Sequence, residues 1–260
     1  MTVATVILTM ASGAIVGLTL GLIGGGGSIL ATPLLLYVVG IHSPHVAIGT
    51  SAVAVSANAY ANLVAHWRRG TVWWRCAAVF ALIGTAGALV GASLGVLLDG
   101  RRLLLIFGIV MLVVGALMFR PRSETGDMSR PVDLRMCLAT GSAAVIAGLA
   151  SGFFGIGGGF LIVPALIFAT GMPTMSAVGS SLLAVGTFGL ATALSYASAG
   201  LVDWSLAGGL ILGGVVGGSV GVALAARLST RKAALGRIFA VLVIVVAIYM
   251  ILRNLDSLVR

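Results

Sequence analysis

The sequence predicts an all-α polytopic membrane protein built from two inverted repeats, with about eight transmembrane helices and two short re-entrant or broken half-helices. Hydrophobic residues make up 60% of the 260 residues and charged residues only 8%, and the mean hydropathy is +1.19. Such values lie outside the range of soluble domains. In addition, a glycine-rich stretch occurs twice, and the charges of the loops that follow it change place between the two halves.

Apolar windows long enough to cross a bilayer, about 17 to 25 residues each, define the predicted spans. They lie at about 3–23, 45–66, 76–98, 103–119, 136–154, 176–198, 205–226 and 238–252. Two shorter apolar pieces, Ile29 to Val39 and Phe160 to Thr170, follow the first and fifth spans. The first would extend only about 16 Å, half of a hydrocarbon core of about 30 Å. We therefore expect both pieces to enter the membrane and return, which places the glycines before them near its middle. An inverted repeat needs an odd number of crossings in each half, and full crossings by these pieces would also give an odd number.

The two halves carry the same motifs in the same order. The stretch from Gly17 to Ser28 returns about 131 residues later, from Gly148 to Gly159, and a proline follows each copy at the same distance. A Gly-Thr-Ser turn in the first half also matches a Gly-Ser-Ser turn in the second. We therefore divide the chain into a first repeat, a cytoplasmic linker and a second repeat, at 1–119, 120–135 and 136–260.

Loop charges indicate that the repeats are inverted. The loop after the third segment is basic in the first half, whereas its counterpart in the second half carries only Asp203; after the fourth segment the second half is the more basic. Placing loops 67–75, 120–135 and 227–237 in the cytoplasm puts 11 of the 15 Lys and Arg residues inside, as the positive-inside rule requires. Both termini then lie on the non-cytoplasmic side. The net charge of +9 is explained by this bias rather than by nucleic-acid binding.

The two glycine clusters are the first candidate site. Broken helices in inverted-repeat transporters expose backbone N–H groups and the positive end of a half-helix, which together hold anions. Irregular backbone is tolerated at membrane depth only where protein buries it or where it lines a cavity. Close helix packing is the alternative explanation. The predicted site residues of the two clusters are Gly24, Gly25, Gly26, Gly27, Ser28, Gly155, Gly157, Gly158 and Gly159.

Polar side chains on the long segment after each cluster are the second candidate. In the first half they recur at mostly three- to four-residue spacing, so they share much of one helix face. We predict that they line a cavity, although such residues also hold membrane helices together. The predicted residues are Thr50, Ser51, Asn58, Asn62, Ser180 and Ser181. His66, next to Trp67, is expected to be a residue of the cytoplasmic boundary rather than a proton relay.

Glycines also recur every four residues in the fourth segment of each half. Such spacing is typical of membrane helices that pack closely through small residues, so we expect a structural role for them. The two series are Gly87, Gly91 and Gly95, and Gly213, Gly217 and Gly221.

No Asp, Glu, Lys or Arg lies in the middle of a predicted span. Cation carriers commonly use an intramembrane carboxylate, so its absence favours an anion as the substrate. The two cysteines, Cys76 and Cys137, have no metal-ligand spacing, and the histidines have no nucleophilic partner at suitable spacing. We therefore expect no metal, no cofactor and no enzymatic activity.

Together these motifs resemble the sulfite exporter TauE/SafE family, also called the toluene sulfonate uptake permease group. The matching residues are the doubled glycine stretch with Pro33 and Pro164, the turns at 49–51 and 179–181, and the segment 200–204. The resemblance covers nearly the whole chain. It implies a bacterial inner-membrane transporter of sulfur-containing anions with about eight spans. Trp73 departs from the family, in which an Asp like Asp203 is expected at this place.

Our hypothesis from the sequence is a secondary transporter of a small anion of the sulfite, sulfonate or sulfoacetate class, with export as the expected direction. The substrate would lie between the two glycine clusters, and the halves would rock around it. A passive anion channel, which would use the same donors, and a carrier of a non-sulfur organic anion are the alternatives. The expected partners are the anion and the lipid bilayer, and the exposed apolar faces would permit a homodimer.

Overall fold

The computed structural model describes residues 3–117, 134–155, 159–227 and 232–255, and within these ranges the chain is helical with short connections. The first half contains α1 (Val3–Ile23), the 3₁₀-helix η1 (Gly24–Leu30), α2 (Ala31–Leu34), the π-helix η2 (Leu35–Val39), α3 (Pro44–Arg68), α4 (Trp74–Leu97) and α5 (Gly100–Leu117). The second half contains α6 (Leu134–Phe154), α7 (Gly159–Thr170), α8 (Thr174–Ser198), α9 (Trp204–Arg227) and α10 (Lys232–Leu255). The predicted all-helical class is confirmed.

Several of these helices are suited to a membrane. Five segments of the described ranges are long and apolar enough to cross: Val3–Val39, Trp74–Leu97, Gly100–Leu117, Thr174–Ser198 and Trp204–Ala225. Large apolar side chains also face outward, among them Leu82, Leu97 and Leu212 at 76%, 82% and 62% exposure, as expected for surfaces in contact with lipid. The polytopic membrane class is thus supported by length and by surface chemistry, while the number of about eight spans stays a prediction.

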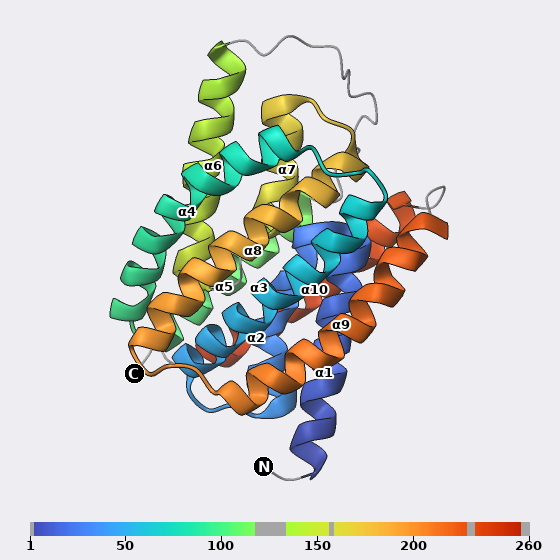
Figure 1. Ribbon diagram of the computed structural model, residues 1–260. Helices are drawn as coiled ribbons and strands as arrows, with labels where there is room; N and C mark the ends of the chain where they lie inside the picture. The colour runs from blue at the N-terminus through green and yellow to red at the C-terminus, as the bar shows by residue number, and fades with distance from the viewer. Residues whose placement is uncertain (1–2, 118–133, 156–158, 228–231, 256–260) are drawn as a thin grey trace.

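Contacts between the helices are reciprocal. Helix α1 packs along α9, and α6, which ends in the same glycine motif in the second half, packs along α4. The pairs α3 with α8 and α5 with α10 each join matching helices of the two halves. In Figure 1, α1 runs upward from its N-terminal end, whereas α6 runs downward. The contacts thus follow the order of the two predicted repeats, whose inversion and boundaries stay a prediction.

Backbone conformation repeats as well. The six glycines with positive φ among the described residues form three pairs at equivalent places in the two halves: Gly24 with Gly155, Gly40 with Gly171, and Gly70 with Gly200. The φ angles of Gly24 and Gly155 are 75° and 66°, a region that glycine enters without steric cost. These two residues end α1 and α6, so the helix breaks fall where the sequence motif predicts them.

The short segment after the first break differs from the expectation. The sequence predicts irregular backbone in the glycine cluster, with the short helix starting at about Ser28. Instead, only Gly24 has a positive φ, Gly24–Leu30 forms a 3₁₀-helix, and helical structure continues to Val39. The segment is therefore longer, about 28 Å if its seven 3₁₀ residues rise about 2.0 Å each and the other nine about 1.5 Å each. Its counterpart α7 has 12 residues, about 18 Å at the α-helical rise of about 1.5 Å. Both remain shorter than a hydrocarbon core of about 30 Å.

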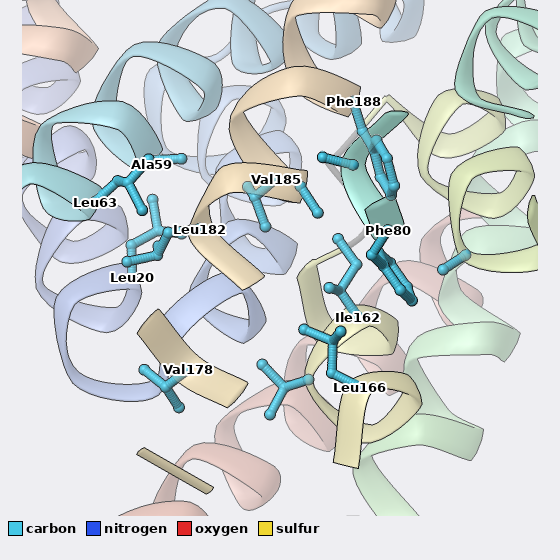
Figure 2. Packing of buried hydrophobic residues seen from close by; sticks show 14 of the residues in the cluster. Leu20, Ala59, Leu63, Phe80, Ile162, Leu166, Val178, Leu182, Val185 and Phe188 are labelled. Carbon is cyan, nitrogen blue, oxygen red and sulfur yellow. The ribbon is translucent and has the colours of Figure 1, made fainter. Parts of the chain in front are cut away.

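A shared apolar core joins the two halves. Figure 2 shows side chains of α1, α3, α4, α7 and α8 meeting in one cluster, with Phe80 and Phe188 stacked at a centroid distance of 6.2 Å. Ile162 and Leu166 of the short helix α7 lie in the same cluster and are fully buried. The short helix of the second half is thus anchored in protein rather than exposed to lipid.

Candidate functional site

Each glycine break docks on the long polar helix of the other half. A Cβ at Gly24 would lie 2.9 Å from Val178 Cγ1 of α8, and one at Gly155 would collide with Ile48 of α3. Val178 and Ile48 occupy equivalent places near the start of these two helices. In Figure 1, α3 begins at the lower end of the molecule and α8 at the upper end, so the two breaks contact helix starts on opposite sides of the bundle. Their expected depth near the middle of the membrane stays a prediction.

The segments that follow the two breaks meet each other. The backbones of Gly25 and Gly159 are in direct contact, because a Cβ at Gly25 would lie only 2.5 Å from Gly159 Cα and 2.6 Å from Val185 Cγ2. The whole stretch Gly24–Ser28 is buried. The described residues of the first cluster are therefore shielded from solvent, and glycine is required at 25 and 159 because the two backbone segments touch. Gly157 and Gly158 lie outside the described residues.

Hydroxyl groups surround the first break. The Gly25 N–H donates to Ser181 Oγ at 3.3 Å, and Ser28 Oγ donates to the Gly25 carbonyl at 2.8 Å. Thr19 Oγ1 donates to the Gly27 carbonyl at 3.3 Å. The structure therefore brings the predicted residues Ser28 and Ser181 together with the glycines. Thr19 was not among the predicted site residues. The only feature of the sequence that pointed to it was its position inside the glycine motif, eight residues before Gly27.

Ser51 joins the same region through the short helix. Its Oγ lies 2.9 Å from Thr32 Oγ1, and both residues are fully buried. Thr32 was not predicted, although it directly precedes the proline of the motif. The short helix is thus tied to α3 by a hydroxyl pair at membrane depth, where few other polar partners exist.

Thr50 and Ser180 hold loops instead. Thr50 Oγ1 accepts the N–H of Asp203 at 2.9 Å, and Ser180 Oγ accepts the N–H of Trp73 at 2.9 Å. These two bonds are equivalent under the repeat and lie at the starts of α9 and α4. The structure therefore places Thr50 and Ser180 at opposite ends of the bundle, and a contact of either with substrate stays a prediction.

Position 73 carries a tryptophan where an Asp is expected, and the equivalent Asp203 in the second half caps a helix. The Asp203 carboxylate accepts the N–H groups of Ser205 and Leu206 at 3.0 and 3.1 Å, which satisfies donors at the start of α9. Trp73 keeps the backbone bond to Ser180 but provides no side-chain cap for α4. The departure at Trp73 therefore removes a cap and leaves the buried polar groups in place.

Asn58 and Asn62 face α9 rather than the glycine breaks. Asn58 Nδ2 donates to the Leu210 carbonyl at 3.3 Å, and its amide packs on Gly214, while Asn62 Nδ2 donates to the Asn58 carbonyl at 2.9 Å. Both side chains are buried, and Asn58 Oδ1 has no hydrogen-bond partner in the protein. Asn58 thus offers one unsatisfied acceptor at the α3–α9 contact.

His66 is buried against other helices, at 2% exposure, while its expected depth at the cytoplasmic boundary stays a prediction. Its Nδ1 lies 3.0 Å from Thr71 Oγ1, and its Nε2 lies 3.4 Å from the carbonyl of Gly21 near the end of α1. The equivalent residue in the second half is Tyr196, which is fully buried. His66 therefore helps to fix α1 close to the first break.

Charge is absent from the buried part of the site. The buried polar residues that the structure describes are Ser, Thr, Asn and one His, with no Asp, Glu, Lys or Arg among them. Across the same described ranges, no group of three His, Cys, Asp or Glu side chains could hold a metal ion. What remains for a ligand is a set of hydroxyl groups and backbone N–H groups at the helix breaks.

Comparisons with known proteins agree with this architecture. The family model described as "Sulfite exporter TauE/SafE" matches residues 9–250. A "Probable membrane transporter protein" of Xylella fastidiosa (strain 9a5c) is 61% identical over 260 residues, covering all of both chains. YunE of Bacillus subtilis (strain 168), which carries the same description, is 26% identical over 80% of this chain and 84% of its own. No solved structure matches.

Proposed function

The chain belongs to the sulfite exporter TauE/SafE family, a family of membrane transporters, and on that premise we propose that it is a secondary transporter of a small sulfur-containing anion. The anion would be of the sulfite, sulfonate or sulfoacetate class. Transport across the bacterial inner membrane would proceed by alternating access of the two halves, with export as the direction. The transporter class follows from the family and from relatives such as the Xylella protein.

The observation that carries the proposal is the contact, inside the protein, between the segments that follow the two glycine breaks. Each break is held by the polar helix of the other half, so a small rotation of one half against the other would separate Gly25 from Gly159. The first N–H groups of a helix have no intrahelical partner and carry the positive end of its dipole. Separation would therefore present these donors to an anion, whereas in the conformation described here Gly24–Ser28 are buried.

The chemistry of the buried region supports an anion. Among the described residues, those that are buried and polar include no carboxylate, and a cation would need one in this setting. Hydroxyl and amide donors suit an oxyanion, which can accept several hydrogen bonds at once.

Flux measurements in proteoliposomes test this function. Radiolabelled sulfite, thiosulfate, sulfoacetate and taurine would be offered with chloride as the control, with a pH gradient applied or collapsed. We expect saturable uptake of a sulfur anion and acceleration by unlabelled substrate on the far side, which a passive channel would not show. A lack of preference over chloride would overturn the substrate assignment, and preference for a carboxylate would favour the non-sulfur alternative.

A substitution at Gly26 tests the position of the site. A Cβ at Gly26 would lie 3.4 Å from Ile23 Cγ2 and 3.8 Å from Phe239 Cε1, so Gly26→Leu fills space beside the break without striking backbone. We expect folded protein that has lost at least about tenfold in flux, as when one positioned donor is blocked. Gly208→Leu is the matched control, because nothing lies within 4 Å of a Cβ at Gly208 on α9. Normal flux in Gly26→Leu would refute this site.

A further inference from the structure

A cavity of about 750 Å³ lies at the far end of the first short helix. It is formed where the turn after η2, the start of α5 and the end of α10 come together. Gly40, with a φ of 86°, ends the helical segment that begins at the first glycine break. The cavity is thus separate from the buried site but is lined by the same short segment.

The cavity is basic. Arg101 of α5 and Arg253 of α10 line it from two different helices, and His42 lines it from the loop before α3. Among the residues that the structure describes, no Asp or Glu lines the cavity. Nearby Asp99 is exposed, and its carboxylate accepts the N–H groups of Arg101 and Arg102 at 2.8 and 3.3 Å, which lower its pKa. The Asp99 carboxylate therefore caps the start of α5 and is not part of the cavity wall.

Aromatic and apolar groups form the rest of the wall. The rings of Tyr37 and Tyr249 meet edge to face at a centroid distance of 4.9 Å, and Asn254 Nδ2 donates to Tyr37 Oη at 3.2 Å. The Arg253 guanidinium carbon lies 5.8 Å from the centre of the Tyr249 ring, a distance at which a cation is attracted to an aromatic face. Asn254 is itself 92% buried. The tyrosines and Arg253 thus hold one another in place.

We propose that this cavity binds an organic oxyanion, with the anionic head on Arg101 and Arg253 and an apolar body against Tyr37 and Tyr249. Two guanidinium groups from separate helices can form charge-assisted hydrogen bonds with the oxygens of one head group. A bare inorganic anion would leave the aromatic wall without a partner. Binding itself does not depend on transport, but the role of the cavity as a substrate site on the transport path rests on the proposed function. Tyr37 connects the cavity directly to the segment that carries the first break.

Binding would be measured by calorimetry on the full chain in nanodiscs of phosphatidylcholine alone, with benzenesulfonate as the probe and methanesulfonate for comparison. We expect benzenesulfonate to bind more tightly, and Arg101→Gln and Arg253→Gln each to weaken it by about tenfold or more, since each removes a charge-assisted contact. Arg102→Gln is the matched control, because Arg102 is next in sequence, equally charged and not part of the lining. The affinity of the Arg102→Gln variant for benzenesulfonate should stay within about twofold of that of the unchanged protein, because Arg102 is expected to act only as a screened surface charge.

The outcomes separate this proposal from the proposed function. Unchanged binding in both Arg101→Gln and Arg253→Gln would overturn the cavity site even if the protein transports normally. Arginine-dependent binding in a protein that transports no sulfur anion would support the cavity and refute the function. A lipid head group has the same chemistry, so nanodiscs with phosphatidylglycerol form a second arm. Arginine-dependent retention of that lipid, with no benzenesulfonate binding in phosphatidylcholine, would overturn capture of a free anion.

Discussion

At the scale of single residues, the two halves differ most at one equivalent pair of contacts. Phe188 of α8 packs on Phe80 and Gly84 of α4, whereas Asn58 of α3 packs at the matching place of α9. The repeat thus keeps the geometry but replaces an aromatic contact by a buried amide. A buried acceptor without a partner, such as Asn58 Oδ1, costs about 1 to 3 kcal/mol. A polar group kept at such a cost is a candidate for contact with the substrate or its water.

This reasoning predicts the behaviour of Asn58→Leu. The leucine side chain is branched like that of asparagine and has no oxygen that could be left unsatisfied. The free energy of unfolding should therefore be unchanged or increased by up to about 1 kcal/mol. Flux should nevertheless fall by about tenfold or more if the amide contacts the substrate. The control is Ser56→Ala on the same helix, which removes a hydroxyl bonded to the Gly186 carbonyl at 2.8 Å. Lower stability with normal flux in Asn58→Leu would assign Asn58 a structural role.

At the scale of helices, the glycine series of the fourth segments have the packing role that their spacing predicts. Cβ atoms at Gly87, Gly91 and Gly95 would meet backbone of α6, and those at Gly213, Gly217 and Gly221 would meet backbone of α1. The prediction of close packing is confirmed for both series. Because lipid tails compete with apolar side chains, close backbone approach of this kind is a main source of helix association in membranes.

The α1–α9 contact can be tested with a single methyl group. In Gly17→Ala the new Cβ would collide with the carbonyl of Gly214, so the helices must separate. We expect a loss of about 1 to 3 kcal/mol in stability, the usual cost of overpacking, measured as a lower midpoint of thermal unfolding in detergent. Gly208→Ala on α9 is the control, because it adds its methyl in open space and favours the helix by up to about 1 kcal/mol. Equal midpoints for the two variants would contradict this account of the contact.

At the scale of the whole molecule, more of the fold than of the candidate site could be predicted from the sequence. Apolar length, the doubled motif and glycine at helix ends are local features, and they predicted the helices, the breaks at Gly24 and Gly155 and the packing series. Partners across the two halves are set only by tertiary structure. The sequence therefore did not show that Thr50 and Ser180 hold loops. Nor did it show that Gly25 meets backbone of Gly159, whereas a Cβ at Gly26 would meet only side-chain atoms.

The orientation of the molecule remains a prediction that the ends of α8 can test. Thr174 begins this helix and Ser198 ends it, and Figure 1 places these ends at opposite sides of the bundle. The positive-inside rule puts the Thr174 end in the cytoplasm and the Ser198 end outside. In a background in which Cys76 and Cys137 are replaced by serine, we expect Ser198→Cys to react with a membrane-impermeant maleimide in intact cells. Thr174→Cys should react only after permeabilisation.

Neither substitution changes charge, so the variants do not disturb the loop charges that set the orientation. Reversed labelling would place both termini in the cytoplasm and the Arg101–Arg253 cavity on the cytoplasmic side, because the cavity lies at the end of the molecule where α3 begins and α10 ends. An exporter would then meet its substrate first at that cavity, whereas in the predicted orientation the cavity is the last site before release. The labelling result therefore decides whether the basic cavity serves as the entrance or as the exit of the transport path.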